Sequence, residues 1–288
     1  MNAGEVAIAG VALVAATITG ALGYGFSSIT VPAALLVYTG RVLNPALVLV
    51  EAFMNAVTLW INRRSLRAVW PRMRPLLVGV VPGVIAGSLL LAHTDPGRLK
   101  LFTFAVLLPL ILLQSAGVRR PIRRERAAAV PGGVALGALY GATTISGPPL
   151  ALLFNNQGLT KDEFRAALSI FRLAESLCTM VAYAALGLFT RSALAVAGTL
   201  APSAAVGIPL GYLALRSIAP EAFRRTCMAT DALLVGFALA RTLVDLHLVP
   251  AAAAYAGFAA VACTEACIVA AFVLGRLRRP PVAEGAIR

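Results

Sequence analysis

Apolar runs of membrane-spanning length follow one another along most of this 288-residue chain. A helix that crosses the hydrocarbon core of a bilayer needs about 20 mostly apolar residues. The stretches that meet this requirement are 42–61, 75–92, 99–116, 166–188, 193–215, 228–244 and 249–274. Hydrophobic residues make up 59% of the chain and charged residues 13%, whereas soluble domains have about a half and about a quarter. We therefore expect an all-α polytopic membrane protein with about seven to nine membrane helices.

Arginine-rich segments between these runs predict the orientation of the chain. They lie at 63–74, at 119–126, around Arg216, Arg224 and Arg225, and in the tail from residue 276. Because segments rich in Lys and Arg stay on the cytoplasmic side, we expect all four to be cytoplasmic. This holds if two further apolar segments, 6–38 and 127–156, do not cross the membrane fully. The alternative is eight or nine complete spans, with one basic segment outside.

The segments 6–38 and 127–156 each contain a break rich in glycine, proline and hydroxyl residues. When the sequence is shifted by 117 positions, 20–36 aligns with 137–153 without a gap, and seven of the seventeen positions are identical. A pair of Gly/Pro-interrupted apolar segments in matching places is typical of secondary transporters. We expect two inverted repeats, each opening with a broken or re-entrant helix. The expected parts are a first membrane repeat at 1–118, a basic cytoplasmic linker at 119–126, a second repeat at 127–275 and a cytoplasmic tail at 276–288.

Irregular backbone at these breaks predicts a ligand site. Lipid cannot satisfy N–H and C=O groups that leave a helix, so they must face protein, water or a ligand. Free N–H groups at the start of a half-helix attract anions, and Pro32 and Pro149 stand where such half-helices would begin. The candidate anion-binding residues of the breaks are Gly25, Ser27, Ser28, Thr30, Pro32, Thr143, Thr144, Ser146, Gly147 and Pro148. The alternative is that the small residues only allow helices to pack closely.

Ionisable side chains inside the apolar runs are further candidates, because a charge within a membrane is costly and functional by default. Arg172 offers a permanent charge and five donors, which suit an oxyanion. Asn55 falls on Arg172 under the same shift and is the second candidate for binding the anion. Glu51 and Glu175 are the candidates for a carboxyl that carries a coupling proton. The alternative role of Arg172 is a structural pair with Glu175, and we interpret Asp231, Arg241 and Glu265 as packing or interface charges.

Other chemistries find little support in the sequence. The chain has 2 histidines, too few for a histidine-based metal site or proton relay. Cys263 and Cys267 are four residues apart, but with no histidine nearby we expect no metal, and we expect no cofactor. The absence of a Walker A sequence argues against an ATP-driven pump, and the absence of a nucleophile-base pair argues against an enzyme. The net charge of +13 reflects topology signals rather than a nucleic-acid-binding face.

The second break and the residues after it resemble a known family. Its most specific part is Gly141-Ala-Thr-Thr-Ile-Ser-Gly-Pro-Pro-Leu-Ala-Leu-Leu-Phe, followed by Gly158-Leu-Thr-Lys-Asp-Glu-Phe-Arg-Ala-Ala-Leu. The chain is similar over nearly its whole length to the TauE/SafE family of sulfite and organosulfonate exporters, also called the toluene sulfonate uptake permease family. The resemblance implies a carrier of the bacterial inner membrane that moves small sulfur-containing anions, coupled to protons or another ion. Members often carry runs of glycine in each break, whereas this chain carries bulkier and hydroxyl residues there.

Together these features predict a secondary transporter that works by alternating access, with a midplane anion site shared by the two breaks. An anion channel whose breaks form a selectivity filter and a membrane assembly factor without transport are the alternatives. The expected partners are the small anion, the lipid bilayer and coupling protons, with no nucleic acid. Association into a homo-oligomer is left open.

Overall fold

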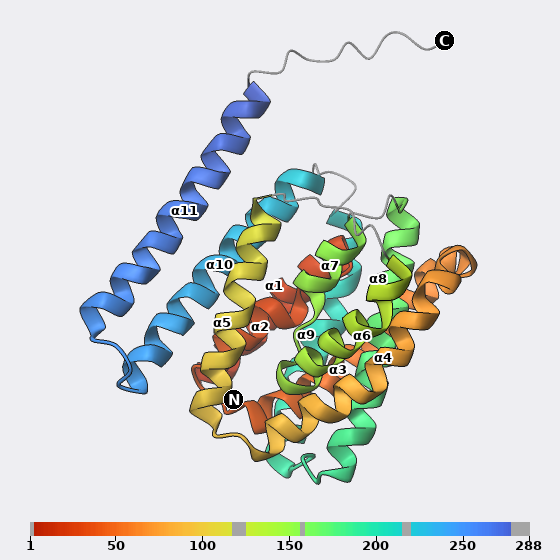
Figure 1. The fold of residues 1–288 in the computed structure, drawn as a ribbon, viewed down its shortest axis with the longest axis horizontal. Coiled ribbons are helices and arrows are strands. Elements are labelled where there is room, and N and C mark those ends of the chain that lie inside the picture. Colours follow the sequence, from red (N-terminus) through yellow and green to blue (C-terminus); the bar gives the residue numbers. More distant parts are fainter. Residues whose placement is uncertain (1–2, 117–124, 156–158, 215–219, 278–288) are drawn as a thin grey trace.

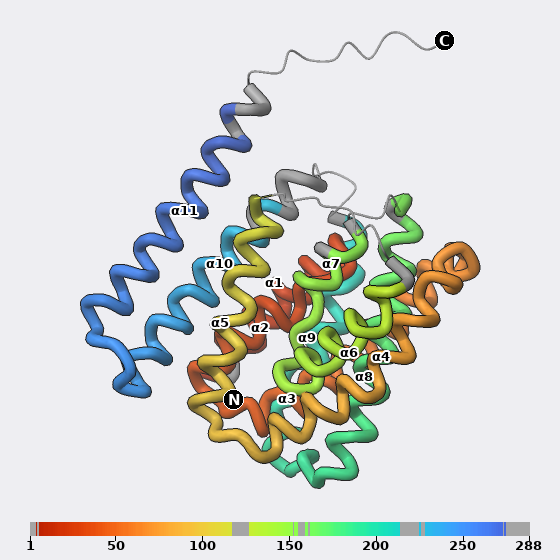
Figure 2. Tube along the Cα trace, viewed as in Figure 1, coloured from red at the N-terminus to blue at the C-terminus, as the bar shows by residue number. Residues whose placement is uncertain are grey.

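The computed structural model describes residues 3–116, 125–155, 159–214 and 220–277. The predicted linker at 119–126 and the predicted tail at 276–288 lie mostly outside these residues, as does Arg216. Figures 1 and 2 show that the described chain is helical. Its elements are α1 (Ala3–Leu22), α2 (Phe26–Ala34), α3 (Gly40–Asn62), the short 3₁₀ helix η1 (Arg63–Ser65), α4 (Leu66–His93), α5 (Pro96–Ser115), α6 (Glu125–Thr143), α7 (Gly147–Asn155), α8 (Lys161–Ala185), α9 (Arg191–Ala214), α10 (Pro220–Asp245) and α11 (Ala251–Leu277).

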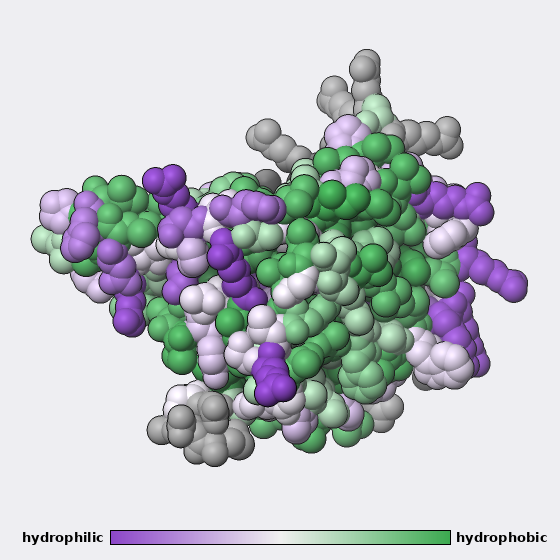
Figure 3. All heavy atoms as spheres, turned by 90° about the horizontal axis from the view of Figure 1, so that it is seen from below, coloured by the Kyte–Doolittle hydropathy of each residue, from purple (hydrophilic) through white to green (hydrophobic). Residues whose placement is uncertain are grey.

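Long apolar helices confirm a polytopic helical membrane protein. In the described chain, five helical stretches are long and apolar enough to cross a membrane, and the first of them contains α3, η1 and α4. They are Gly40–His93, Pro96–Ser115, Asp162–Ala185, Arg191–Leu213 and Ala251–Phe272, with shorter apolar helices at Val6–Leu22 and Ala127–Thr143. Each predicted unbroken run corresponds to one helix, namely α3, α4, α5, α8, α9, α10 or α11. Most of the face seen in Figure 3 is apolar, with hydrophilic side chains gathered in a few clusters.

The basic segment at 63–74 is helical and continues into the next span, although the sequence placed that span only from residue 75. After η1, α4 begins at Leu66 and continues without interruption to His93. Arginine is a good helix former, so the helix extends beyond its apolar part. The Arg63 guanidinium lies over the Trp60 ring, 4.3 Å from its centroid. Tryptophan and arginine are typical of the zone where a membrane helix meets water.

Close helix packing explains several of the glycines. α4 packs along α6, and α1 packs along α9 (Figure 1). A Cβ on Gly87 of α4 would collide with the Ala138 carbonyl of α6, and a Cβ on Gly211 of α9 would collide with the Thr17 carbonyl of α1. Gly20, inside the first repeated segment, packs against the backbone of α9 in the same way. Small residues thus allow the helix backbones to touch, as the alternative interpretation of the glycines proposed.

Helix ends recur along the chain at a constant offset. α1 and α6 end at Leu22 and Thr143, α2 and α7 begin at Phe26 and Gly147, and α3 and α8 begin at Gly40 and Lys161. The offset is 121 residues. Each of two side-chain hydrogen bonds described below also joins two residues that are 121 positions apart in the chain. It exceeds the shift of 117 in the sequence alignment by four residues, about one helical turn. The sequence alignment therefore keeps the helical face but misplaces equivalent positions along the helix by one turn.

Each half of the chain caps the first helix of the other half. Asn44 Nδ2, in α3, donates to the carbonyl of Ala142 near the end of α6 at 2.9 Å. Arg165 Nη2, in α8, donates to the carbonyl of Ala21 near the end of α1 at 2.5 Å. The two donor residues, Asn44 and Arg165, are separated by the same offset of 121, and so are the two acceptor residues, Ala21 and Ala142. Because the last carbonyls of a helix lack partners within it, these bonds stabilise the chain where it enters each break.

Candidate functional site

The two breaks separate α1 from α2 and α6 from α7. In the first break, Gly23 and Gly25 have φ values of 89° and 121°, which glycine adopts at little steric cost. In the second, Thr144 has a φ of 58°, an outlier for a β-branched residue. Strained backbone of this kind clusters at functional sites. The breaks are therefore the first place to look for a ligand site.

The breaks contact each other in the interior. Gly147 begins α7, and a Cβ built on it would lie 3.4 Å from Tyr24 Cβ and 3.8 Å from Gly25 N. Gly25 is the residue that caps the start of α2, and Tyr24 is buried. The first residues of α2 and α7 therefore lie close together, and so do the partial positive charges of these two helix starts.

One expectation about the half-helices is wrong. Pro32 does not begin the first half-helix, because α2 begins at Phe26 and Pro32 lies in its last turn. The physical reason is that Gly25, at a positive φ, ends the irregular backbone earlier than the proline could. The second half-helix begins as expected, since Pro148 and Pro149 directly follow Gly147 in the first turn of α7. Proline is favoured there because a first-turn N–H has no partner within the helix.

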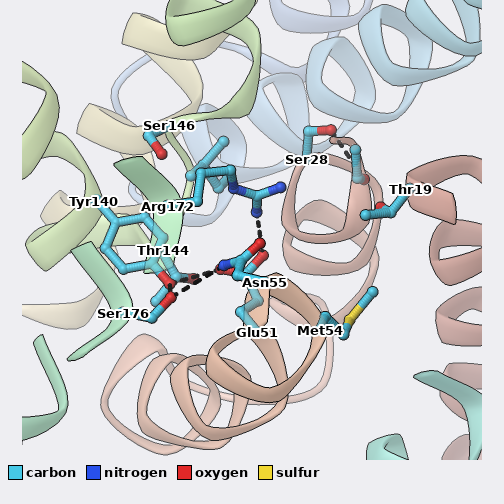
Figure 4. A network of polar contacts seen from close by, with 12 residues as sticks. Thr19, Ser28, Glu51, Met54, Asn55, Tyr140, Thr144, Ser146, Arg172 and Ser176 are labelled. Carbon is cyan, nitrogen blue, oxygen red and sulfur yellow. Dashed lines mark hydrogen bonds and ion pairs between the residues drawn. The ribbon is translucent and has the colours of Figure 1, made fainter. Parts of the chain in front are cut away.

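A buried ion pair joins the two halves next to the breaks (Figure 4). Arg172 Nη2, in α8, lies 2.6 Å from Glu51 Oε1, in α3, and both side chains are 1% exposed. The other carboxylate oxygen of Glu51 accepts a hydrogen bond of 2.7 Å from the Tyr140 hydroxyl of α6. Both oxygens of Glu51 are therefore occupied, which makes this residue a fixed partner of Arg172.

Two further side chains extend this network. The Ser176 hydroxyl lies 2.8 Å from the Tyr140 hydroxyl and accepts from Asn55 Nδ2 at 3.3 Å. Neither Tyr140 nor Ser176 is among the residues predicted from the sequence. Ser176 could have been found, because it lies four residues after Arg172 and so on the same helical face. Asn55 belongs to the network as a partner of Ser176, which is its equivalent at the offset of 121.

Arg172 keeps two donors unused. Among the described residues, neither its Nε nor its Nη1 has a hydrogen-bond partner, although both are buried. The alternative pair with Glu175 is not formed. Glu175 Oε2 accepts from the Ser146 hydroxyl at 2.5 Å, and Glu175 Oε1 has no partner in the described chain. Arg172 thus keeps free N–H donors on two different sides of its guanidinium, and each can donate to an oxygen of an oxyanion.

Three of the remaining predicted hydroxyl residues form local hydrogen bonds. Ser28 donates to the carbonyl of Gly25 at 3.1 Å. Thr143 donates to the carbonyl of Leu139 at 2.7 Å, and Thr144 donates to the carbonyl of Thr143 at 2.6 Å. These bonds shape the breaks. Ser27 and Thr30 are buried in α2, and the Thr30 hydroxyl has no partner among the described residues.

Within the described chain, no group of three or more His, Cys, Asp or Glu side chains could hold a metal ion.

Comparison with known proteins identifies the family. No curated protein and no solved structure shows a match. Residues 8–239 match the family described as Sulfite exporter TauE/SafE, a match that runs from α1 into α10. The chain therefore belongs to the TauE/SafE family of sulfite exporters, and this membership makes it a membrane transporter of sulfite-type anions and not an enzyme.

Proposed function

We propose that the chain is a secondary carrier of the bacterial inner membrane that moves sulfite or a small organosulfonate by alternating access, coupled to protons or another ion. The observation that carries this proposal is the buried guanidinium of Arg172, held by Glu51 on one nitrogen and unpaired on two others. A buried donor without a partner costs about 1–3 kcal/mol. An anion that accepts from one of these donors removes the cost of that donor, and sulfite and sulfonate groups carry several oxygens on one sulfur.

The start of α2 supplies further positive potential. Arg172 and Glu51 neutralise each other, so a bound anion needs another source of positive charge. Phe26, Ser27 and Ser28 have backbone N–H groups in the first turn of α2, where the helix dipole favours an anion. Figure 4 shows Arg172 between Ser146 of the second break and Ser28 of α2. The proposed anion site lies between the guanidinium and the start of α2.

Reciprocal packing of the two halves supports a pair of repeats, 1–118 and 127–275. α4 packs on α6 as α9 packs on α1, and the capping pairs Asn44–Ala142 and Arg165–Ala21 are exchanged in the same manner. We propose that the repeats are inverted in the membrane and that the anion site lies on the axis between them. Alternating access would then move the two halves against each other around this site.

The test measures anion binding by thermal unfolding of the purified protein in detergent. A ligand at 100 times its dissociation constant stabilises the folded state by about 2.7 kcal/mol, so sulfite should raise the melting temperature of the wild-type protein. Arg172→Gln should abolish this shift. It also leaves Glu51 buried without its partner, which costs about 3–5 kcal/mol.

A double variant and a surface control separate loss of binding from loss of folding. Arg172→Gln combined with Glu51→Gln removes both charges, so it should regain stability and still show no sulfite shift. Arg241→Gln replaces an arginine whose side chain is 49% exposed and should keep the shift. A sulfite shift of wild-type size in either Arg172 variant would refute the proposed site. Saturable flux in proteoliposomes, without channel currents in a planar bilayer, would support a carrier.

A further inference from the structure

Asp231 is a fully buried carboxyl that the proposed anion site does not use. It lies on α10 with 0% exposure. Neither of its carboxyl oxygens has a hydrogen-bond partner among the described residues. Burying an ionised carboxylate without a partner is far more costly than burying a neutral group. Within a membrane-spanning bundle, such a residue indicates a functional site.

The group that faces Asp231 is the hydroxyl of Ser28, in the first turn of α2. Ser28 directs its own proton to the carbonyl of Gly25 at 3.1 Å. The lone pairs of the Ser28 oxygen therefore remain available, and a hydroxyl can accept as well as donate. A protonated Asp231 carboxyl can donate its O–H to these lone pairs, whereas an ionised carboxylate would have to draw the Ser28 proton away from the Gly25 carbonyl. The geometry thus favours a proton on Asp231 in this conformation.

Among the described side chains, the charged groups on the elements that pack against α10 have other partners or, like Arg98 of α5, are exposed. α2 carries no ionisable residue, and α1 carries none from Val6 to Leu22. Elsewhere, Glu265 of α11 accepts from the Ser115 hydroxyl, Lys100 of α5 donates to the carbonyl of Leu35, Arg225 of α10 donates to the carbonyl of Ser115, and Arg241 pairs with Asp245 on the surface. None of these contacts neutralises Asp231.

We infer that Asp231 is a proton-binding site at the first break. The protonated carboxyl donates its O–H to the Ser28 oxygen while α2 is in the position that it has in this structure. An anion at the start of α2 disfavours a second negative charge nearby, so anion binding strengthens proton binding. When α2 moves or water reaches the carboxyl, the proton can leave. This site, rather than Glu51 with its two occupied oxygens, would carry the coupling proton. The coupling role rests on the proposed carrier function, whereas proton binding by Asp231 does not.

The first test compares the pH dependence of stability in detergent. A proton held in the folded state and released on unfolding adds stability at low pH, and this contribution is lost as the pH rises. The wild-type protein should therefore lose stability with rising pH more steeply than Asp231→Asn, which cannot release a proton. Asp245→Asn is the matched control, because Asp245 is a 67% exposed aspartate of the same helix, and it should keep the wild-type slope. An unchanged slope in Asp231→Asn would overturn the inference.

Infrared spectroscopy provides a second measurement that does not depend on stability. The wild-type protein near neutral pH should show the C=O stretching band of a protonated carboxyl, and this band should be absent from Asp231→Asn. Ser28→Ala, which keeps the carboxyl and removes its acceptor, should shift the band. An identical band in all three proteins would exclude Asp231 as its source and contradict the inference.

Flux in proteoliposomes tests the coupling role. A pH gradient should accelerate sulfite flux by the wild-type protein, whereas Asp231→Asn should lose this acceleration and keep the sulfite-induced rise in melting temperature. Acceleration by a sodium gradient alone, retained in Asp231→Asn, would overturn the coupling role. If no variant binds sulfite while the pH slopes differ as expected, the proposed function fails and the proton site stands.

Discussion

The two breaks occupy equivalent places in the fold but differ in chemistry. Both follow a long helix whose end is capped from the other half, and both precede a helix of nine residues. The first break turns at glycines and leaves the N–H groups of Phe26, Ser27 and Ser28 at the start of α2. The second turns at Thr144, and α7 has Pro148 and Pro149 in its first turn, without N–H groups. Helix lengths and packing are thus repeated, while the first turn of α2 keeps N–H groups that the prolines remove from the first turn of α7.

Each break also faces a buried carboxyl, and the two carboxyls come from helices at different places in the two halves. Ser146 of the second break donates to Glu175 of α8, while Ser28 beside the first break faces Asp231 of α10. α8 and α10 are not equivalent at the offset of 121, so these contacts are not copies of each other. In the proposed mechanism, anion attraction and proton binding both belong to the first break.

Exchanging the two buried charges of the ion pair is the most severe test of whether the two halves of the chain are structurally equivalent. Glu51 and Arg172 are separated by the offset of 121, so Glu51→Arg with Arg172→Glu should rebuild the ion pair with its direction reversed. Each single replacement buries two like charges and should cost at least the 3–5 kcal/mol or so of a broken buried pair. Thermal unfolding of the double variant should recover part of this loss. Recovery is incomplete because Tyr140 has Thr19 as its equivalent, which donates to its own helix. A double variant less stable than both singles would contradict the equivalence.

Adding a methyl group where two helices touch tests whether the α4–α6 and α1–α9 pairs depend on close contact between their backbones. Gly211→Ala in α9 and Gly87→Ala in α4 each place a Cβ against a carbonyl of the facing helix, and we expect each to cost about 1–3 kcal/mol. Gly198→Ala is the control within α9, because nothing lies within 4 Å of its Cβ position. Thermal unfolding in detergent would measure all three. A neutral effect at one of the two pairs would show that its helices separate readily.

Side-chain tolerance at the turns tests the local difference between the breaks. Gly25→Ala forces an L-residue to a φ of 121° and should cost about 1–2 kcal/mol. Thr144→Gly relieves the strain of a β-branched residue at 58° and should lower stability less than Gly25→Ala does. The melting temperatures of the two variants provide the comparison, and the reverse order would refute it.

The smallest expected difference concerns the starts of α3 and α8. Thr39 and Thr160 are equivalent caps, but only Thr160 forms a capping box, accepting from Glu163 N at 3.4 Å while Glu163 Oε2 accepts from Thr160 N at 2.9 Å. Thr160→Ala should therefore cost about 1 kcal/mol, and Thr39→Ala should cost clearly less. Equal losses in thermal unfolding would show that the box contributes nothing measurable.

Sequence patterns predicted the elements well because their causes are local. Apolar length predicted the long helices, and the glycines and prolines predicted both breaks. Arg172 stood out because a charge inside an apolar run is rare. The partner of Arg172 was not predictable, since Glu175 is its neighbour along the helix while Glu51 reaches it only through packing of α3 on α8. Asp231 was interpreted as a packing charge because nothing in its own segment indicates that α2 lies opposite.

The sequence by itself determined that this chain is a helical membrane protein with two repeated, interrupted segments and a buried arginine. These properties follow from residue composition over one helix length and from the conformational limits of glycine and proline. Only the tertiary structure decided which groups meet: Arg172 with Glu51, Ser146 with Glu175, and Ser28 with Asp231. The physical reason is that many positions on a helix offer similar faces one turn apart. Close packing of distant helices selects among them, and here it selects an offset of 121 rather than 117.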